Sequence, residues 1–357
     1  MRLTTDAVAA ALAGATPPEF DADLSTAVDR IEIADGDPPG VKLVLGFPAA
    51  GVREALANWV AERLAAAGLP VGCVEIDWNI SAHAVQGKLQ PLKGVKNLIA
   101  VASGKGGVGK STVAVNLALA LAAEGAHVGV LDADIYGPSQ PRMLGLEGER
   151  PTSPDGKHID PLVGHGLQCM SIGFLVDQDT PMIWRGPMVT QALTQFLNDT
   201  NWDNLDYLII DMPPGTGDIA LTLAQRVPVS GAIIVTTPQE IALLDARKGL
   251  KMFEKVDVNI LGIVENMSTY ICPKCGDEEP IFGAGGGQRL VNEYGTSLLG
   301  SLPLDLRIRE QTDSGRPTVI AEPDSDIARA YRALARRAAA QLAQTAPAAF
   351  PNIVEED

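Results

Sequence analysis

The sequence predicts an α/β fold: a mainly parallel sheet covered by helices on both faces, preceded by a small α/β domain. The chain has 357 residues, of which 46% are hydrophobic, enough to fill a sizeable core. From residue 95 onward, short apolar runs alternate with helical stretches, which is typical of strands buried on both faces of a parallel sheet. Residues 1–80 carry strand and helix patterns of their own.

Residues 1–80 are expected to form the small α/β domain. Its elements, in chain order, are a helix after Thr5, a strand at 27–34, a strand at 41–47, a helix at 52–68 and a strand at 71–80. Residues 81–94 are polar and interrupted by Gly and Pro, so they are the expected linker.

Residues 95–345 are expected to form the main domain, and 346–357 an acidic tail. The expected strands are NLIAVASG, HVGVLDAD, YLIIDMPP, GAIIVTTP, ILGIVENM and SLLGSLPL. Residues 326–343 carry one apolar stripe and predict a helix that faces the core. Parallel sheets bind ligands at the carboxyl ends of their strands, so the polar residues after these strands are the candidate site.

The charge of the chain argues against two kinds of partner. A formal charge of -16 repels phosphate backbones and anionic lipid surfaces, and no basic patch offsets it, so neither nucleic acid nor membrane is expected as a partner. No apolar run approaches a membrane span, and no basic region precedes an apolar block at the N-terminus. We therefore expect a cytoplasmic protein. Four cysteines are too few for a disulfide framework at this length.

The segment GKGGVGKST directly follows the first strand of the main domain and fits the P-loop pattern of NTPases. In this pattern, backbone N–H groups surround phosphate oxygens, Lys110 neutralises the β and γ phosphates of ATP, and the Ser111 hydroxyl binds Mg²⁺. A glycine-rich turn without a ligand is the alternative. The candidate nucleotide-binding residues here are Gly104, Lys105, Gly106, Gly107, Val108, Gly109, Lys110, Ser111 and Thr112.

Carboxylates follow the next two strands. Asp132 and Asp134 end the second strand, and Asp211 ends the third, at the Walker B position. Mg²⁺ that keeps most of its water needs one or two protein oxygens, so Ser111 directly, with Asp211 or Asp132 through water, would hold it. The alternative is that these residues serve only as helix N-caps.

A single Cys-x-x-Cys pair, Cys272 and Cys275, has no second pair in the chain. Zinc and iron-sulfur sites both require four ligands, so a two-fold dimer would supply the other two. Composition does not choose between a bridging iron-sulfur cluster and zinc, and a redox dithiol is a further alternative.

GKGGVGKST resembles the deviant Walker A motif of the ParA/MinD/nitrogenase iron protein class. This resemblance implies that Lys105 reaches the ATP of a partner subunit across a nucleotide-sandwich dimer. It also implies that Asp134 positions the attacking water and that Asn266, at the end of ILGIVEN, contacts adenine. An ordinary surface lysine and a turn-forming asparagine are the plain alternatives.

Further motifs resemble the Mrp/ApbC branch of this class: LDADIYGPSQP, WRGPM, DMPPGTGD, TTPQEIALLDARKG, GIVENMSTYICPKCG, IFGAGGG and GSLPLDLRIRE. The resemblance implies a homodimer with weak ATP hydrolase activity, which binds a [4Fe-4S] cluster through Cys272 and Cys275 and transfers it to apo iron-sulfur proteins. A MinD/ParA-type switch and a cluster-bearing reductase are the alternatives. Residues 1–80 resemble, more weakly, the assembly-associated domain that often precedes this ATPase, and they diverge from it.

Overall fold

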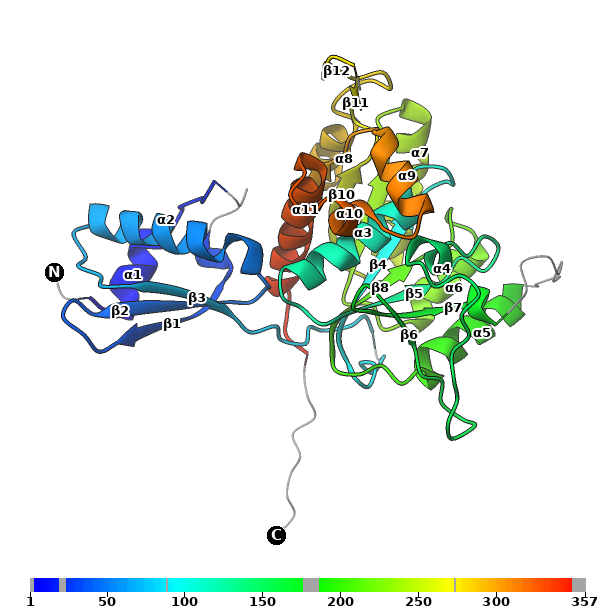
Figure 1. Ribbon diagram of the computed structural model, residues 1–357, viewed down its shortest axis with the longest axis horizontal. Helices are drawn as coiled ribbons and strands as arrows, with labels where there is room; N and C mark the ends of the chain where they lie inside the picture. The colour runs from blue at the N-terminus through cyan, green and yellow to red at the C-terminus, as the bar shows by residue number, and fades with distance from the viewer. Residues whose placement is uncertain (1–2, 19–23, 88, 176–185, 273, 349–357) are drawn as a thin grey trace, which may run out of the picture.

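A computed structural model describes residues 3–18, 24–87, 89–175, 186–272 and 274–348 of the chain. Figure 1 shows a small N-terminal sheet beside a larger α/β body. The N-terminal elements are α1 (Thr5–Leu12), β1 (Val28–Ala34), β2 (Gly40–Leu45), α2 (Arg53–Ala66) and β3 (Val74–Trp78), with 3-10 turns at Leu24–Thr26 and Ala50–Val52. Trp184 and Arg185 of WRGPM, and residues 349–357 of the expected tail, lie outside the described residues.

The N-terminal sheet has the order β1-β2-β3, with β1 antiparallel and β3 parallel to β2. Helices α1 and α2 cover one face of it (Figure 1). Helix α2 buries Leu56, Val60 and Leu64, which lie four residues apart and therefore on one side of the helix. The expected elements of this region are all present, with ends that differ by a few residues.

The larger sheet has eight strands in the order β13-β10-β9-β4-β8-β5-β7-β6. They are β4 (Val95–Ser103), β5 (Val128–Asp132), β6 (Leu162–Gly164), β7 (Leu167–Ser171), β8 (Leu205–Asp211), β9 (Gly231–Thr236), β10 (Ile260–Glu265) and β13 (Leu298–Ser301). Neighbouring strands are parallel except for β6 and β7, which form a hairpin. This confirms the predicted fold class and all six predicted strands.

Helices cover both faces of this sheet. The chain crosses from β4 to β5 through α3 and from β9 to β10 through α7, in opposite directions along the sheet, which places α3 and α7 on opposite faces. The helices are α3 (Lys110–Ala123), α4 (Gln140–Met143), α5 (Gly186–Asp199), α6 (Asp218–Arg226), α7 (Glu240–Lys255), α8 (Gly286–Tyr294), α9 (Leu306–Asp313), α10 (Thr318–Ala321) and α11 (Asp326–Ala343), with a 3-10 turn at Ile172–Phe174.

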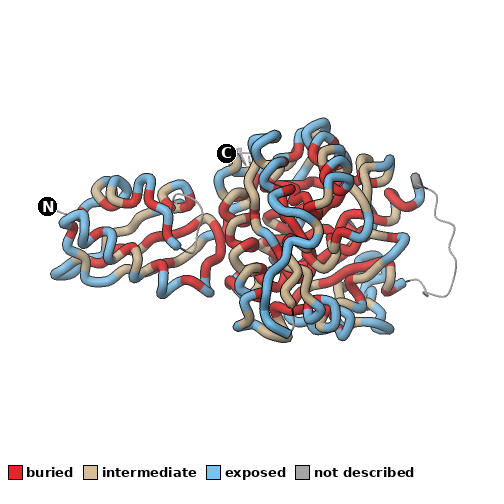
Figure 2. The backbone as a smooth tube through the Cα atoms, turned by 90° about the horizontal axis from the view of Figure 1, so that it is seen from above, coloured by how far each residue is buried: buried red, intermediate tan, exposed pale blue. Residues whose placement is uncertain are grey.

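Helix α3 lies at the centre of the core. It is buried nearly all round, because it packs on β4, β5 and β8 and is covered by α10 and α11. Figure 2 shows buried residues running through the interior of the larger body, with exposed residues on its outside. Helix α11 directs its predicted apolar stripe inward, and every member of the stripe is buried: Ile327, Tyr331, Leu334, Ala338 and Leu342. Within the described residues, no helix combines the length and hydropathy needed to cross a membrane.

Glu124 joins the N-terminal region to the larger body and also forms a buried ion pair within that body. The Glu124 carboxylate, at the C-terminal end of α3, accepts from Arg336 Nη1 of α11 at 2.7 Å and from the backbone N–H of Gly51 at 2.8 Å. The Ala50 N–H donates to the Glu124 carbonyl at 3.1 Å. The two sheets therefore meet on α3 and α11. The division into domains at 81–94 stays a prediction.

Replacing Arg336 by methionine should destabilise the protein by about 3–5 kcal/mol, because the fully buried Glu124 charge loses its cationic partner. Urea denaturation followed by far-UV circular dichroism measures this loss. Arg329→Met on the same helix is the control, since the Arg329–Asp326 pair is exposed and should contribute at most about 1 kcal/mol. Equal midpoints for the two variants would show that the buried pair does not hold this junction.

Candidate functional site

The loop 104–109 connects β4 to α3, and its glycines are required by close packing. Gly104 lies against the backbone of α7, where an added Cβ would come within 2.1 Å of the Asp245 carbonyl carbon. Gly109 has a φ of +82° and is the N-cap of α3, so a side chain would be strained there. The loop therefore presents backbone N–H groups and a helix N-terminus at the carboxyl end of β4.

A cavity of about 300 Å³ opens over this loop. It is lined by Ser103, Gly106, Gly107, Gly109, Lys110, Ser111, Thr112, Asp134, Gly137, Ser139, Met143 and Pro214. Its volume lies at the lower end of the range for ligand pockets and suits a phosphate chain. The structure thus brings most of the predicted phosphate-binding residues together with Asp134.

Lys110, which lines this cavity, forms a buried ion pair with Asp211 of β8. Lys110 Nζ donates to Asp211 Oδ1 and lies 3.2 Å from Ser111 Oγ. Their side chains are 6% and 0% exposed, so neither charge is solvated. A buried charge that loses its partner carries a large penalty, so Lys110 and Asp211 depend on each other until another charged group replaces one of them.

Asp132 anchors the loop that follows β5. Its Oδ2 accepts from the N–H groups of Ser139 and Gln140 at 2.9 and 3.0 Å and from Ser171 Oγ at 3.2 Å. Burial, followed by repulsion from Asp211, raises the pKa of Asp132 to about 7. The carboxylate thus acts as a cap for this loop and for α4, and contact with a metal through water stays a prediction.

Asp134 is half-buried on the wall of the cavity, and burial raises the pKa of its carboxyl group. Lys105 is also half-buried, and its carbonyl accepts from Ser103 Oγ at 2.9 Å. Among the described residues, no carboxylate forms an ion pair with the Lys105 ammonium group. Asp134 therefore lines the cavity, Lys105 does not, and the roles assigned to the two side chains stay predictions.

Asn266 lies behind the phosphate loop. Its Nδ2 donates to the Val108 carbonyl at 2.8 Å, and the residue is buried. This contact links the end of β10 to the loop, whereas the predicted contact with adenine is not tested.

Mg²⁺ fits the donors present at this edge. The Ser111 hydroxyl and the Asp211 carboxylate both lie within hydrogen-bond distance of Lys110 Nζ and are oxygen ligands of the kind that Mg²⁺ takes. Among the described residues, Ser139 Oγ and Gln140 Oε1 are buried and have no hydrogen-bond partner. Water molecules carried by a metal ion can satisfy such buried atoms.

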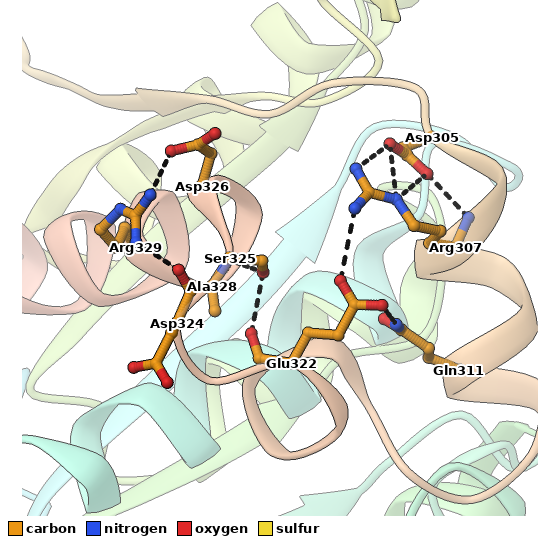
Figure 3. Close-up of polar contacts among 9 residues, drawn as sticks. All are labelled: Asp305, Arg307, Gln311, Glu322, Asp324, Ser325, Asp326, Ala328 and Arg329. Atoms are coloured by element: carbon orange, nitrogen blue, oxygen red, sulfur yellow. Dashed lines mark hydrogen bonds and ion pairs between the residues drawn. The ribbon is translucent and has the colours of Figure 1, made fainter. Parts of the chain in front are cut away.

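The loop after β13, near the expected adenine site, is fixed by polar contacts (Figure 3). Asp305 Oδ1 accepts from the Arg307 N–H at 2.8 Å, and Asp305 Oδ2 pairs with the Arg307 guanidinium at 2.7 Å. Arg307 also reaches Glu322 Oε2 at 3.3 Å, while Gln311 Nε2 donates to Glu322 Oε1 at 2.7 Å. These contacts attach α9 to the turn that precedes α11.

The cysteine pair lies on a small hairpin beyond β10, at the same edge of the sheet as the phosphate loop (Figure 1). The hairpin consists of β11 (Tyr270–Ile271) and β12 (Glu278–Glu279). It is closed by backbone hydrogen bonds from the Cys272 N–H to the Asp277 carbonyl and from the Gly276 N–H to the Cys272 carbonyl. Cys272 is half-buried and Cys275 is exposed.

The environment of Cys272 favours its thiolate. Hydrogen bonds from the backbone N–H of Lys274, then from the N–H and thiol of Cys275, lower the pKa of Cys272. The thiolate is the form that binds metal. Among the described residues, no group of three or more His, Cys, Asp or Glu side chains could hold a metal ion. The two sulfurs alone fall short of a four-ligand site, and the predicted sharing of a metal or cluster between two copies stays a prediction.

Iodoacetamide should alkylate Cys272 faster than Cys73 at pH 7, because hydrogen bonds lower the pKa of Cys272 and so raise its thiolate fraction. Exposure would give the opposite order, because Cys73 is exposed and Cys272 only half-buried. Mass spectrometry of tryptic peptides after timed quenching measures both rates. Faster alkylation of Cys73 at pH 7 would show that the backbone N–H groups do not stabilise the Cys272 thiolate.

The end of β10 contacts both α8, which follows the cysteine hairpin, and the phosphate loop. Glu265, the last residue of β10, accepts from the Gly287 N–H of α8 at 2.5 Å. The next residue, Asn266, contacts the phosphate loop. Neither Glu265 nor Gln140 could be singled out from the sequence, although both lie within the motifs given above, because a motif does not show which of its polar side chains turn inward.

The fold and the site together define a P-loop NTPase with a cysteine hairpin at the nucleotide edge of its sheet. A family model described as ParA: NUBPL iron-transfer P-loop NTPase matches residues 94–339. The chain belongs to this family, as the sequence predicts.

Three known proteins illustrate the similarity. The iron-sulfur cluster carrier protein of Escherichia coli (strain K12) is 62% identical over 275 residues, covering 76% of this chain and 74% of that one. The protein of the same name from Synechocystis sp. is 48% identical over 354 residues, covering 96% and 99%. The nucleotide-binding protein in complex with ADP from Archaeoglobus fulgidus superimposes with a TM-score of 0.58 at 39% identity, covering 65% of this chain and 90% of that one.

Proposed function

We propose that this chain is an iron-sulfur cluster carrier that binds a [4Fe-4S] cluster between the Cys272 and Cys275 pairs of two copies and delivers it to apo iron-sulfur proteins. The observation that carries the proposal is the accessible hairpin. It offers two thiols, Cys272 and Cys275, and its hydrogen bonds lower the pKa of Cys272, which favours the thiolate that binds metal. The names of the relatives support the same role. A cluster held at such an exposed place can pass to another protein.

The homodimer is supported by apolar side chains around the hairpin. Ile241 and Leu244 begin α7, Ile281 follows β12, and Leu306 begins α9. All four are exposed and follow the carboxyl ends of strands, at the edge that carries the phosphate loop and the cysteines. A second copy seated on this edge would bury them and complete the sulfur ligands.

Nucleotide binding would change the buried ion pair between Lys110 and Asp211. The phosphates would attract Lys110 away from Asp211. The freed carboxylate would then be available to bind Mg²⁺ together with the Ser111 hydroxyl. Bound Mg²⁺ supplies charge neutralisation at the phosphates. Asp134, on the cavity wall, is placed to orient an attacking water, and Lys105 is free to approach the phosphates of a partner subunit. Weak ATP hydrolysis coupled to cluster binding follows from this assignment.

Two other assignments are less well supported. A MinD/ParA-type switch requires a membrane-binding segment or a basic face, and the chain carries a formal charge of -16. A reductase would keep its cluster, and interfacial zinc would give no visible absorption. The cytoplasmic location and any role of residues 1–80 in cluster handling stay predictions.

Anaerobic reconstitution with iron and sulfide tests the carrier role. We expect about four irons per dimer, absorbance near 400 nm, and transfer to an apo-ferredoxin that gains its own spectrum. A cluster that stays bound while the ferredoxin remains apo would favour the reductase. Binding of zinc in place of iron under these conditions would overturn the cluster assignment.

A further inference from the structure

Gln140 is a buried polar residue that the proposed mechanism does not yet use. It is the first residue of α4, directly after the loop 134–139, and it is 0% exposed. Glutamine is rarely buried to this extent unless its amide has specific partners. Its contacts therefore indicate why it lies there.

Gln140 connects three parts of the nucleotide site. Its Nε2 donates to Asp211 Oδ2 at 2.9 Å and to the Ser111 carbonyl at 3.2 Å. Both partners are acceptors, so the orientation of the amide is fixed, with its nitrogen toward them. Its backbone N–H donates to Asp132 Oδ2 at 3.0 Å. The residue thus joins β8, the start of α3 and the capped loop after β5.

The contacts of Asp211 show what this arrangement achieves. Among the described residues, the buried carboxylate accepts from two side chains, Lys110 at Oδ1 and Gln140 at Oδ2. When Lys110 turns to the phosphates, Gln140 is the side-chain donor that remains. An ionised carboxylate buried without a donor would oppose the departure of Lys110, and so would oppose nucleotide binding.

We propose that Gln140 is a positioning residue that holds Asp211 while Lys110 moves from Asp211 to the phosphates. The inference rests on the proposed function as a nucleotide-binding carrier. Gln140 does not touch the nucleotide in this role; it acts through Asp211. Gln140 Oε1 is buried and has no hydrogen-bond partner among the described residues. The polar contacts of the amide are therefore those that Nε2 donates to Asp211 and Ser111.

The test is a double-mutant cycle on the affinity of the full-length chain for a fluorescent ADP analogue without Mg²⁺. Gln140→Met keeps the length of the side chain and removes the donor. It should weaken binding roughly tenfold, because Asp211 keeps Lys110 as a donor in the free protein but has no side-chain donor left once Lys110 turns to the phosphates. In an Asp211→Asn background the carboxylate charge is gone, so the same replacement should change the affinity less than about twofold.

Gln288→Met is the matched control, because Gln288 is an exposed glutamine on α8 whose amide contacts Asn292. It should leave the affinity unchanged. If Gln140→Met does not fold, as judged by circular dichroism and thermal melting, Gln140→Leu enters the same cycle.

Two outcomes would overturn the proposal: an affinity within twofold of wild type for Gln140→Met, or an equal loss in both backgrounds, which would indicate packing alone. Cluster transfer by the wild-type chain is measured separately. A chain that binds nucleotide but does not transfer a cluster refutes the carrier role and leaves the cycle interpretable, whereas a wild-type chain that binds no nucleotide overturns both proposals.

Discussion

Replacing Cys272 or Cys275 by serine should abolish cluster binding while ADP affinity stays within about twofold of wild type. Each replacement removes two of the four thiolates of a dimer, and a serine hydroxyl is a poor ligand for iron. The fold should survive, because backbone hydrogen bonds close the hairpin and serine keeps them. Iron content and absorbance near 400 nm after anaerobic reconstitution measure the loss.

Cys73→Ser is the control for these variants. Cys73 is exposed, precedes β3 of the N-terminal sheet and is far along the chain from the hairpin, so its replacement should leave the iron content unchanged. Serine variants at 272 and 275 that still hold a full complement of iron would show that the cluster lies elsewhere. A loss confined to the Cys73 variant would move the search to the N-terminal sheet.

Replacing Lys110 by alanine should abolish nucleotide binding and also destabilise the free protein by about 3–5 kcal/mol, because it leaves Asp211 buried without its cation. The double variant Lys110→Ala/Asp211→Asn should recover most of the stability and none of the binding. Calorimetric titration with ADP and urea denaturation separate the two effects.

Lys105→Ala is the informative comparison for Lys110. The Lys105 ammonium has no carboxylate partner among the described residues, so its removal should cost little stability and should spare ADP binding. Turnover should fall if the side chain neutralises phosphates across a dimer. Identical behaviour of the two lysine variants, in binding and in turnover, would contradict the role assigned to Lys105.

The sheet and the phosphate loop could be predicted because their signals are local. The strands of the main sheet are continuous apolar runs, and the loop is a contiguous pattern of glycines and lysines. The order of the strands then brings Asp132 and Asp211 together, since the two residues are partners in the register of β5 and β8.

The buried polar contacts could not be predicted, because they depend on which side chains turn inward. Glu124, which follows α3, and Arg336 on α11 are separated by 212 positions, and nothing in the sequence around either residue marks it as buried. Gln140 stands within a quoted motif, yet no spacing distinguishes it from a solvated glutamine. Asn266 was assigned to adenine by resemblance, and its contact with the Val108 carbonyl appears only once β10 lies beside the loop.

The position of Glu124 has a consequence for any assembly of two chains. Helix α3 has 14 residues, and at a rise of 1.5 Å per residue it separates the phosphate loop from Glu124 by about 20 Å. In a dimer that shared its nucleotide face, the N-terminal sheet of each chain would therefore lie about the length of α3 away from that face. A protein fused to, or captured by, that sheet could remain attached throughout a cycle of nucleotide exchange without blocking it.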